Sequence, residues 1–206
     1  MSLELPSAPA LADALIVDPF YLAISVDFEH DMPTRKAVLA RYFAYSLGEA
    51  ARTGRFLATE DGKLGAAAWL LPRTNDVDAA ESAAKNEFLA STLGPRGYDN
   101  YHRIVEFMAA RAPAVVPAGA WYLSILGISP AAQGRGLGAQ LLAPTLVEAD
   151  AAGAPCFLET FTPRSVAFYE RLGFRSAAEH LEPVTNSAYA IMCRPAADIL
   201  RNNHGK

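Results

Sequence analysis

Apolar residues recur along this chain with two different periods, which predicts helices and strands in alternation. The clearest helical face runs from Val38 to Ala50, where apolar residues recur at three- and four-residue steps. Asp31 and Pro33 supply start signals before this face, and Gly54 supplies a stop after it. Further helices are predicted over residues 10–17, 137–152 and 163–172.

Several shorter apolar runs are typical of β-strands. Asp61-Gly62 separates the runs 55–60 and 63–71, and this pair predicts a hairpin because both residues tolerate positive φ. Residues 121–128 are almost continuously apolar, as expected for a central strand that is buried on both faces. Gly127 interrupts this run and predicts a bulge or a close approach of backbone. Other strands are predicted over residues 2–5, 155–160, 174–182 and 187–194.

The interleaving of helices and strands predicts one α/β or α+β domain over residues 1–206. We expect residues 74–118 to form a helical insert in this domain, because their apolar pattern fits two helices rather than a second core. A break at residues 93–97 separates the two helices, and Pro113 and Pro117 end the second one.

The composition excludes several classes of protein. An apolar fraction of 51% is too high for a disordered chain, and 18 basic against 22 acidic residues do not provide a surface for nucleic acid. Cys156 and Cys193 form no Cys-x-x-Cys pair, which fits a reducing compartment and argues against structural zinc. The start of the chain does not have the pattern of a signal peptide, and no run reaches the roughly 18 apolar residues of a membrane span. We therefore expect a cytoplasmic protein with no metal and no nucleic-acid or membrane partner.

A glycine-rich turn, Gln133-Gly134-Arg135-Gly136-Leu137-Gly138, lies between the buried strand and the next helix. Its glycines allow close approach of a ligand, and the free N–H groups and dipole of the helix start favour an anion such as pyrophosphate. A Walker loop is excluded because Ala139-Gln140 follows Gly138 in place of Lys-Ser/Thr, and the glycine spacing differs from that of a dinucleotide fingerprint. A helix start that binds nothing is the alternative interpretation.

The spacing Gln-x-x-Gly-x-Gly after a buried strand resembles the coenzyme A signature of the GNAT superfamily of acetyltransferases. About 30 residues further on, the segment from Ser165 to Phe174, with Tyr169 at its centre, resembles the second signature of this superfamily. Cys156 to Thr160 is similar to the fifth strand of the family, and Gly65 to Pro72 is similar to the third strand of one bacterial branch. The resemblance is strong over residues 119–194 and weaker over residues 10–73.

This resemblance implies a fold, a co-substrate and a cofactor site. The fold would be a mixed α/β structure with a mostly antiparallel, twisted sheet of six or seven strands, splayed fourth and fifth strands, and helices on both faces. The co-substrate would be acetyl-CoA, bound without a metal. Family members often have Asn where this chain has Thr162 and Ser165, so the contacts that this loop makes with the cofactor are left open. The residues implied in cofactor binding are Leu126, Gly127, Ile128, Gln133, Gly134, Arg135, Gly136, Leu137, Gly138, Ala139, Ser165 and Phe168.

The resemblance assigns Tyr169 as the general acid that protonates the leaving thiolate, whereas a core tyrosine is the alternative. The general base is not identified, because strand alternation can point Glu159 away from the cleft. The expected function is N-acetylation of a small-molecule amine. Acetylation of a protein amine, a non-catalytic acyl-CoA sensor and a domain that binds no CoA are alternatives, and a homodimer is left open. The other candidate bases, expected to be surface groups, are Glu29, His30, Asp31, His102 and Glu106.

Overall fold

The structure is a computed structural model that describes residues 5–72 and 79–197. Helix starts follow from local chemistry. The Asp18 carboxylate caps the second helix by accepting a hydrogen bond from the N–H of Phe20 at 3.0 Å, and Asp31 caps the third by accepting one from Thr34 at 3.1 Å. In chain order the elements are α1 (Ala8–Leu15), α2 (Pro19–Ile24), the 3-10 helix η1 (Val26–Phe28), α3 (Met32–Thr53), β1 (Gly54–Ala58), β2 (Gly65–Leu70), α4 (Ala79–Ala109), η2 (Ala112–Ala114), β3 (Trp121–Ile128), η3 (Pro130–Ala132), α5 (Leu137–Ala151), β4 (Cys156–Thr160), α6 (Pro163–Arg171), β5 (Arg175–Glu182) and β6 (Ser187–Arg194).

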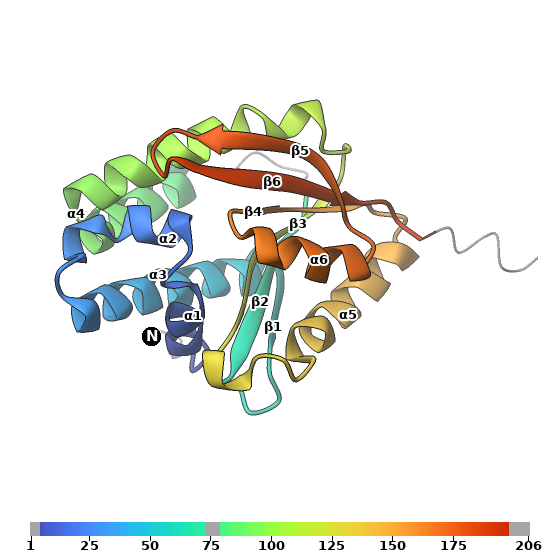
Figure 1. Cartoon of the computed structure of the whole chain (residues 1–206), viewed down its shortest axis with the longest axis horizontal. Coiled ribbons are helices and arrows are strands. Elements are labelled where there is room, and N and C mark those ends of the chain that lie inside the picture. Colours follow the sequence, from blue (N-terminus) through green and yellow to red (C-terminus); the bar gives the residue numbers. More distant parts are fainter. Residues whose placement is uncertain (1–4, 73–78, 198–206) are drawn as a thin grey trace, which may run out of the picture.

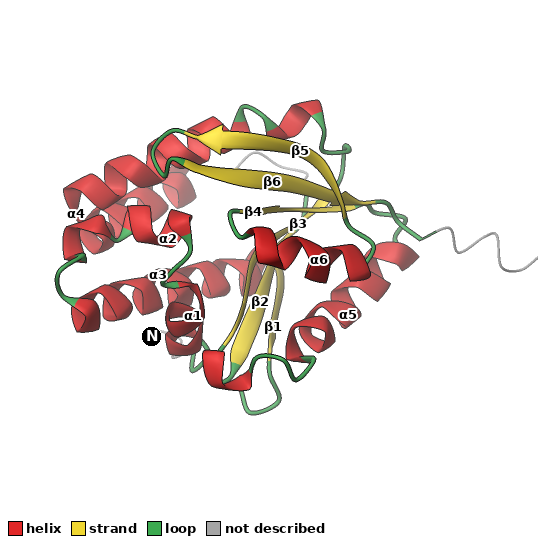
Figure 2. Cartoon of the chain, viewed as in Figure 1, coloured by secondary structure: helices red, strands yellow, loops and turns green. Residues whose placement is uncertain are grey.

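The described strands form one six-stranded sheet in the order β1-β2-β3-β4-β6-β5 (Figures 1 and 2). Neighbouring strands are antiparallel except β3 and β4, which run parallel. These two strands pair only where Trp121 to Leu123 face Cys156 to Leu158, and beyond this point they part. The β2–β3 register skips Ser124, and an extra residue of this kind bends the strand that carries it. β3 therefore follows β2 and leaves β4, which opens the sheet.

Both faces of the sheet are covered by helices. On one face α1 and α3 pack against Ala66 and Ala68 of β2, with α4 packed against α2 and α3, and on the other face α5 packs against Ala67 and Trp69. All four of these strand residues are fully buried. This two-sided burial explains why β2 reads as a continuous apolar run rather than as an alternating one.

The long helix α4 is two helical segments joined at a kink. Gly94 has φ 75° and ψ 168°, and Pro95 follows it, so the helical hydrogen-bond ladder is broken there. The carboxylate of Asp27 accepts hydrogen bonds from the N–H groups of Arg96 at 2.8 Å and Gly97 at 3.0 Å. Asp27 thus caps the second segment from a distant part of the chain.

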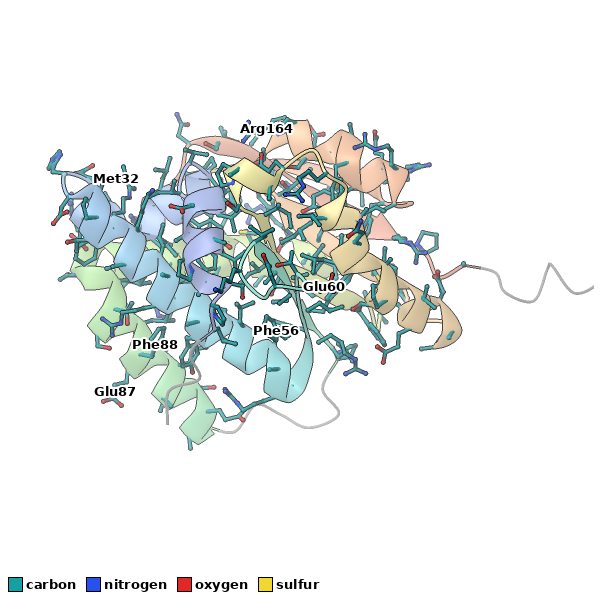
Figure 3. The ribbon with its side chains drawn as sticks, turned by 90° about the horizontal axis from the view of Figure 1, so that it is seen from below. Met32, Phe56, Glu60, Glu87, Phe88 and Arg164 are labelled. Atoms are coloured by element: carbon teal, nitrogen blue, oxygen red, sulfur yellow. The ribbon has the colours of Figure 1, made fainter. Side chains whose placement is uncertain are left out.

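The first segment of α4 lies alongside α3 (Figure 3). Phe88 stacks on Tyr45 of α3 with ring centroids 4.1 Å apart, whereas its neighbour Glu87 points outward from the helix pair. Lys85 Nζ donates hydrogen bonds to both carboxylate oxygens of Glu49 at 3.2 and 2.9 Å. These contacts fix α4 against α3 on the same side of the sheet as α1.

The predicted fold class is confirmed, including the mostly antiparallel sheet with splayed strands, the helices on both faces and the hairpin around Asp61-Gly62. The predicted strand numbers count an expected first strand at residues 2–5, of which residues 2–4 lie outside the described residues. The predicted fourth and fifth strands are therefore labelled β3 and β4. Of the two alternatives for Gly127, close approach holds: a Cβ there would lie 2.6 Å from Cδ2 of Leu11, and the bulge is at Ser124 instead. Two helical segments occupy the region of 74–118 that is described, and their status as an insert in a single domain stays a prediction.

Candidate active site

A cavity of about 640 Å³ lies where β3 ends and α5 begins. Its walls come from the loop before α5, the start of α5, the end of β3, the end of α1 and the length of α6. Arg135, which was predicted to contact the cofactor, is exposed and does not line this cavity. The predicted cofactor residues that do line it are Leu126, Gly127, Ile128, Gln133, Gly134, Gly136, Leu137, Gly138, Ala139, Ser165 and Phe168.

The backbone N–H groups of residues 133–139 are available to an anion. Among the described residues, none of these groups donates a hydrogen bond to a backbone carbonyl. Gly134 and Gly136 have φ of 77° and 79°, a left-handed conformation that only glycine adopts without strain. The Nε2 of Gln133 donates to the carbonyl of Ile128 at 3.0 Å and ties the loop to the strand end. The loop therefore presents several amide donors at the positive end of α5.

Gly138 and Phe168 bring α6 close to this loop. A Cβ at residue 138 would lie 3.2 Å from Cζ of Phe168, which is tighter than ordinary contact. Phe168 in turn packs edge-on against Tyr169, with ring centroids 5.1 Å apart. The glycine at 138 thus determines how closely the helix that carries Tyr169 approaches the anion-binding turn.

A second cavity of about 450 Å³ lies on the other side of Tyr169. It is enclosed by α2, α3, α4, β3 and β4, and it extends between the strands that part. The two cavities have in common the lining residues Leu15, Asp18, Leu126, Thr162, Ser165 and Tyr169. A molecule in one cavity would therefore adjoin a molecule in the other.

Tyr169 is a protonated phenol at this junction. Burial, with a smaller contribution from Asp18, raises its pKa far above the usual value. The ring is held edge-on by Phe168 and by Phe174, the latter with ring centroids 6.0 Å apart. The phenol is protonated at neutral pH, so its hydroxyl can donate a hydrogen bond to a thiolate formed beside it, while the raised pKa makes it a weaker acid than a free tyrosine.

Glu159 of β4 lines the second cavity, so strand alternation does not turn it away from the site. Its Oε2 accepts a hydrogen bond from the hydroxyl of Tyr122 at 3.2 Å, and its Oε1 is buried without a partner among the described residues. Burial raises the pKa of Glu159 to about 7, although the hydrogen bond from Tyr122 opposes this shift. The side chain can therefore accept a proton near neutral pH.

Asp18 joins the N-terminal helices to the loop before α6. Its Oδ2 accepts a hydrogen bond from the hydroxyl of Thr162 at 3.1 Å, while its Oδ1 caps α2. Burial raises the pKa of Asp18, and its hydrogen bonds to Phe20 and Thr162 act in the opposite direction. Thr162 occupies the N-cap position of α6 without capping it, so its hydroxyl is used by Asp18 instead.

A family model described as "Acetyltransferase (GNAT) family" matches residues 18–174, which include most of the residues that line the two cavities and the strands β1 to β4. The chain belongs to the GNAT acetyltransferase family. Members of this family transfer an acyl group from acetyl-CoA to an amine.

Solved structures confirm the GNAT fold. A histone acetyltransferase HPA2 and related acetyltransferase from Corynebacterium glutamicum is 22% identical with a TM-score of 0.63, covering 94% of this chain and 91% of its own. Arylalkylamine N-acetyltransferase 2 from Aedes aegypti is 15% identical with a TM-score of 0.62, covering 91% and 92%. PH1933 from Pyrococcus horikoshii is 13% identical with a TM-score of 0.53, covering 96% and 95%. At these identities the likeness concerns the fold alone.

Several other candidates in this GNAT acetyltransferase lie away from the two cavities. Cys156 is buried in the core, where burial raises its pKa to about 11, so it is a poor nucleophile. Cys193 is half-buried, and its thiol donates to the carbonyl of Val115 at 3.7 Å. None of the helices in the described part of the chain is long and apolar enough to cross a membrane. The candidate bases that line neither cavity are Glu29, His30, Asp31, His102 and Glu106.

Sequence reasoning missed three side chains that the GNAT fold brings to the site. Arg164 and Arg171 of α6 line the first cavity and are exposed, so their guanidinium groups are accessible to phosphate oxygens. Asp18 lies at the junction of the two cavities. The signal for the arginines was their place on either side of Tyr169, within the second signature. Asp18 precedes that signature by more than half of the chain, and only the folded structure relates the two.

Proposed function

We propose that this protein is an acetyl-CoA-dependent N-acetyltransferase that acetylates a primary amine of a small molecule. One observation supports this above all: two cavities meet at Tyr169, in the gap where β3 and β4 part. One cavity has the donors for a diphosphate, and the other has a carboxylate that can accept a proton. The amine and the thioester would then lie on either side of one phenol.

The first cavity fits the coenzyme. Amide groups from Gln133 to Ala139 would bind the pyrophosphate, and Arg164 and Arg171 would pair with phosphate oxygens. The pantetheine arm would lie along Leu126 to Ile128, because this part of β3 has no partner on the side where β4 departs. Ser165 lines both cavities and can contact the acyl end of the arm.

The chemistry is a direct displacement. The neutral amine nitrogen attacks the thioester carbonyl carbon, so that a C–N bond forms while the C–S bond breaks. Glu159 accepts the proton that leaves the nitrogen, and Tyr169 donates its proton to the departing thiolate. The nitrogen's proton then restores the phenol through solvent. The net products are an N-acetyl amine and coenzyme A with a free thiol.

The shape of the second cavity favours a small acceptor over a protein amine. Side chains from α2, α3, α4, β3 and β4 surround it, and a volume of about 450 Å³ is within the range of roughly 300–1,000 Å³ for small-molecule sites. The free thiols of Cys156 and Cys193 support a reducing, cytoplasmic setting.

Two measurements test the proposal. Titration calorimetry should detect binding of acetyl-CoA, and release of free thiol should be detected when a panel of primary amines is added. Binding without turnover for every amine in the panel would favour the acyl-CoA sensor. Absence of binding at millimolar acetyl-CoA would leave only a structural role for the fold.

A further inference from the structure

The second cavity, which is the acceptor cavity under the proposed function, has ionisable groups in two places. Asp18 lines both cavities at their junction, and Glu159 of β4 lines the second cavity only. At the side formed by α3 and α4, Glu49 and Lys85 line it. Lys85 is the one Lys or Arg among the described residues of this lining. The side with the carboxylates of Asp18 and Glu159 therefore attracts a cation, whereas the α3–α4 side has paired charges.

Lys85 neutralises Glu49 in a partly buried setting. Its Nζ lies 3.2 and 2.9 Å from the two carboxylate oxygens, and the two side chains are 33% and 26% exposed. Burial lowers the pKa of Lys85, but Tyr101 and Glu49 outweigh this effect, so the pKa lies above its usual value. The ammonium is charged at neutral pH, and Glu49 is not free to pair with a cation of the substrate.

Aromatic rings line the cavity between these two places. Tyr122 and Phe157 stack with ring centroids 4.5 Å apart, and Tyr42 and Tyr101 lie edge-on at 6.3 Å. Burial and Glu159 raise the pKa of Tyr122, while burial raises that of Tyr101 and Lys85 opposes this. The rings thus lead from Glu159, beside Tyr122, towards the ion pair on α3 and α4, beside Tyr101. Aromatic walls of this kind suit an apolar or aromatic body.

We propose that the acceptor is a primary monoamine with an aromatic body, and that Lys85 excludes diamines by neutralising Glu49. The proposal rests on the proposed function, because it assigns the class of amine that this site acetylates. The amine would lie beside Glu159 and the ring among the tyrosines. The second ammonium group of a diamine would reach the α3–α4 side, where it would meet the cation Lys85 and no free carboxylate. It would lose its hydration without gaining an ion pair, which disfavours binding.

Steady-state kinetics with acetyl-CoA test both parts of the proposal. Phenethylamine and tryptamine represent aromatic monoamines, and cadaverine and spermidine represent amines with further charges. We expect kcat/KM of the wild-type protein to be at least about tenfold higher for the first pair than for the second. Lys85→Gln should free Glu49 and reduce this ratio about fivefold or more, mainly by raising kcat/KM for the diamines.

Two further variants separate this effect from a loss of structure. Arg103→Gln removes a cation from the same helix, where it pairs with Asp99 at 3.5 Å outside the cavity lining, and it should leave the ratio unchanged. The double variant Lys85→Gln/Glu49→Gln removes both charges and should restore the preference for monoamines. Lys85→Arg keeps the charge and should behave as wild type if Lys85→Gln does not fold.

The outcomes distinguish this inference from the function on which it rests. Equal or faster turnover of spermidine by the wild-type protein would overturn the monoamine assignment and leave the acetyltransferase proposal intact. An unchanged ratio in folded Lys85→Gln would overturn the role of Lys85 alone. Binding of acetyl-CoA with no transfer to any amine would overturn the proposed function as well.

Discussion

The hydroxyl of Tyr122 on β3 donates a hydrogen bond to Oε2 of Glu159 on β4 at 3.2 Å. Tyr122 belongs to the short stretch where the two strands pair, and Glu159 lies just beyond it, where they part. This hydrogen bond thus holds the carboxylate just beyond the last pair of β3 and β4, Leu123 and Leu158. This hydrogen bond favours the ionised carboxylate and therefore lowers the pKa of Glu159, whereas burial raises it.

A pH profile tests this relationship. Glu159 accepts a proton only when ionised, so kcat/KM should rise with pH through an inflection near the pKa of about 7. Glu159→Gln should lower kcat/KM by about a hundredfold and abolish that inflection. Tyr122→Phe removes the hydrogen bond that lowers the pKa, so the inflection should move to higher pH. An unshifted inflection in both variants would assign the titration to another group.

The same carboxylate should make the folded protein less stable above neutral pH. The pKa of Glu159 is raised in the folded state, so its contribution to stability is present below the unfolded pKa of 4.5 and is lost as pH rises through about 7. Glu159→Gln avoids this loss and should raise Tm at pH 8. The corresponding gain in the free energy of unfolding is up to about 3 kcal/mol. At pH 4 the two proteins should differ little. Thermal melts at the two pH values measure this, and an equal difference at both would contradict it.

Tyr169→Phe separates catalysis from packing. The ring would keep its contacts with Phe168 and Phe174, but the proton donor would be lost. We expect kcat to fall by about a hundredfold or more, while the Kd for acetyl-CoA measured by calorimetry changes little. If kcat stays within a few-fold of wild type, the tyrosine is a packing residue and the thiolate is protonated by solvent.

A pair of glycine variants tests the anion-binding turn. Gly136 and Gly153 have left-handed φ of 79° and 64°, and a Cβ on either would meet no atom closer than 4.0 Å. Alanine should cost roughly 1–2 kcal/mol of stability at both sites through backbone strain. Gly136→Ala should also weaken binding of acetyl-CoA about tenfold, whereas Gly153→Ala, at the far end of α5, should not. Equal affinities in the two variants would show that the turn is not the pyrophosphate site.

The sequence predicts the elements of this fold better than it predicts the side chains that share the acceptor cavity. The hairpin, the turn before α5 and the helix of Tyr169 each depend on residues close together in the chain, so local patterns identify them. The orientation of Glu159 depends on the parting of β3 and β4, which follows from one skipped residue at Ser124 in the register with β2. No local pattern near Glu159 reports that bulge. Glu49 and Lys85 lie 36 positions apart on two different helices. The periodicity of apolar residues within one helix or strand therefore cannot predict that they form an ion pair.

The parting of β3 from β4 gives the sheet an edge inside the molecule. Exposed strand edges recruit other chains and promote aggregation, and proteins usually shield them with charges, prolines or short strands. Here α1 and α6 line the opening. Under the proposed function, main-chain groups that would promote aggregation at an outer edge of the sheet would instead bind the amide groups of the pantetheine arm.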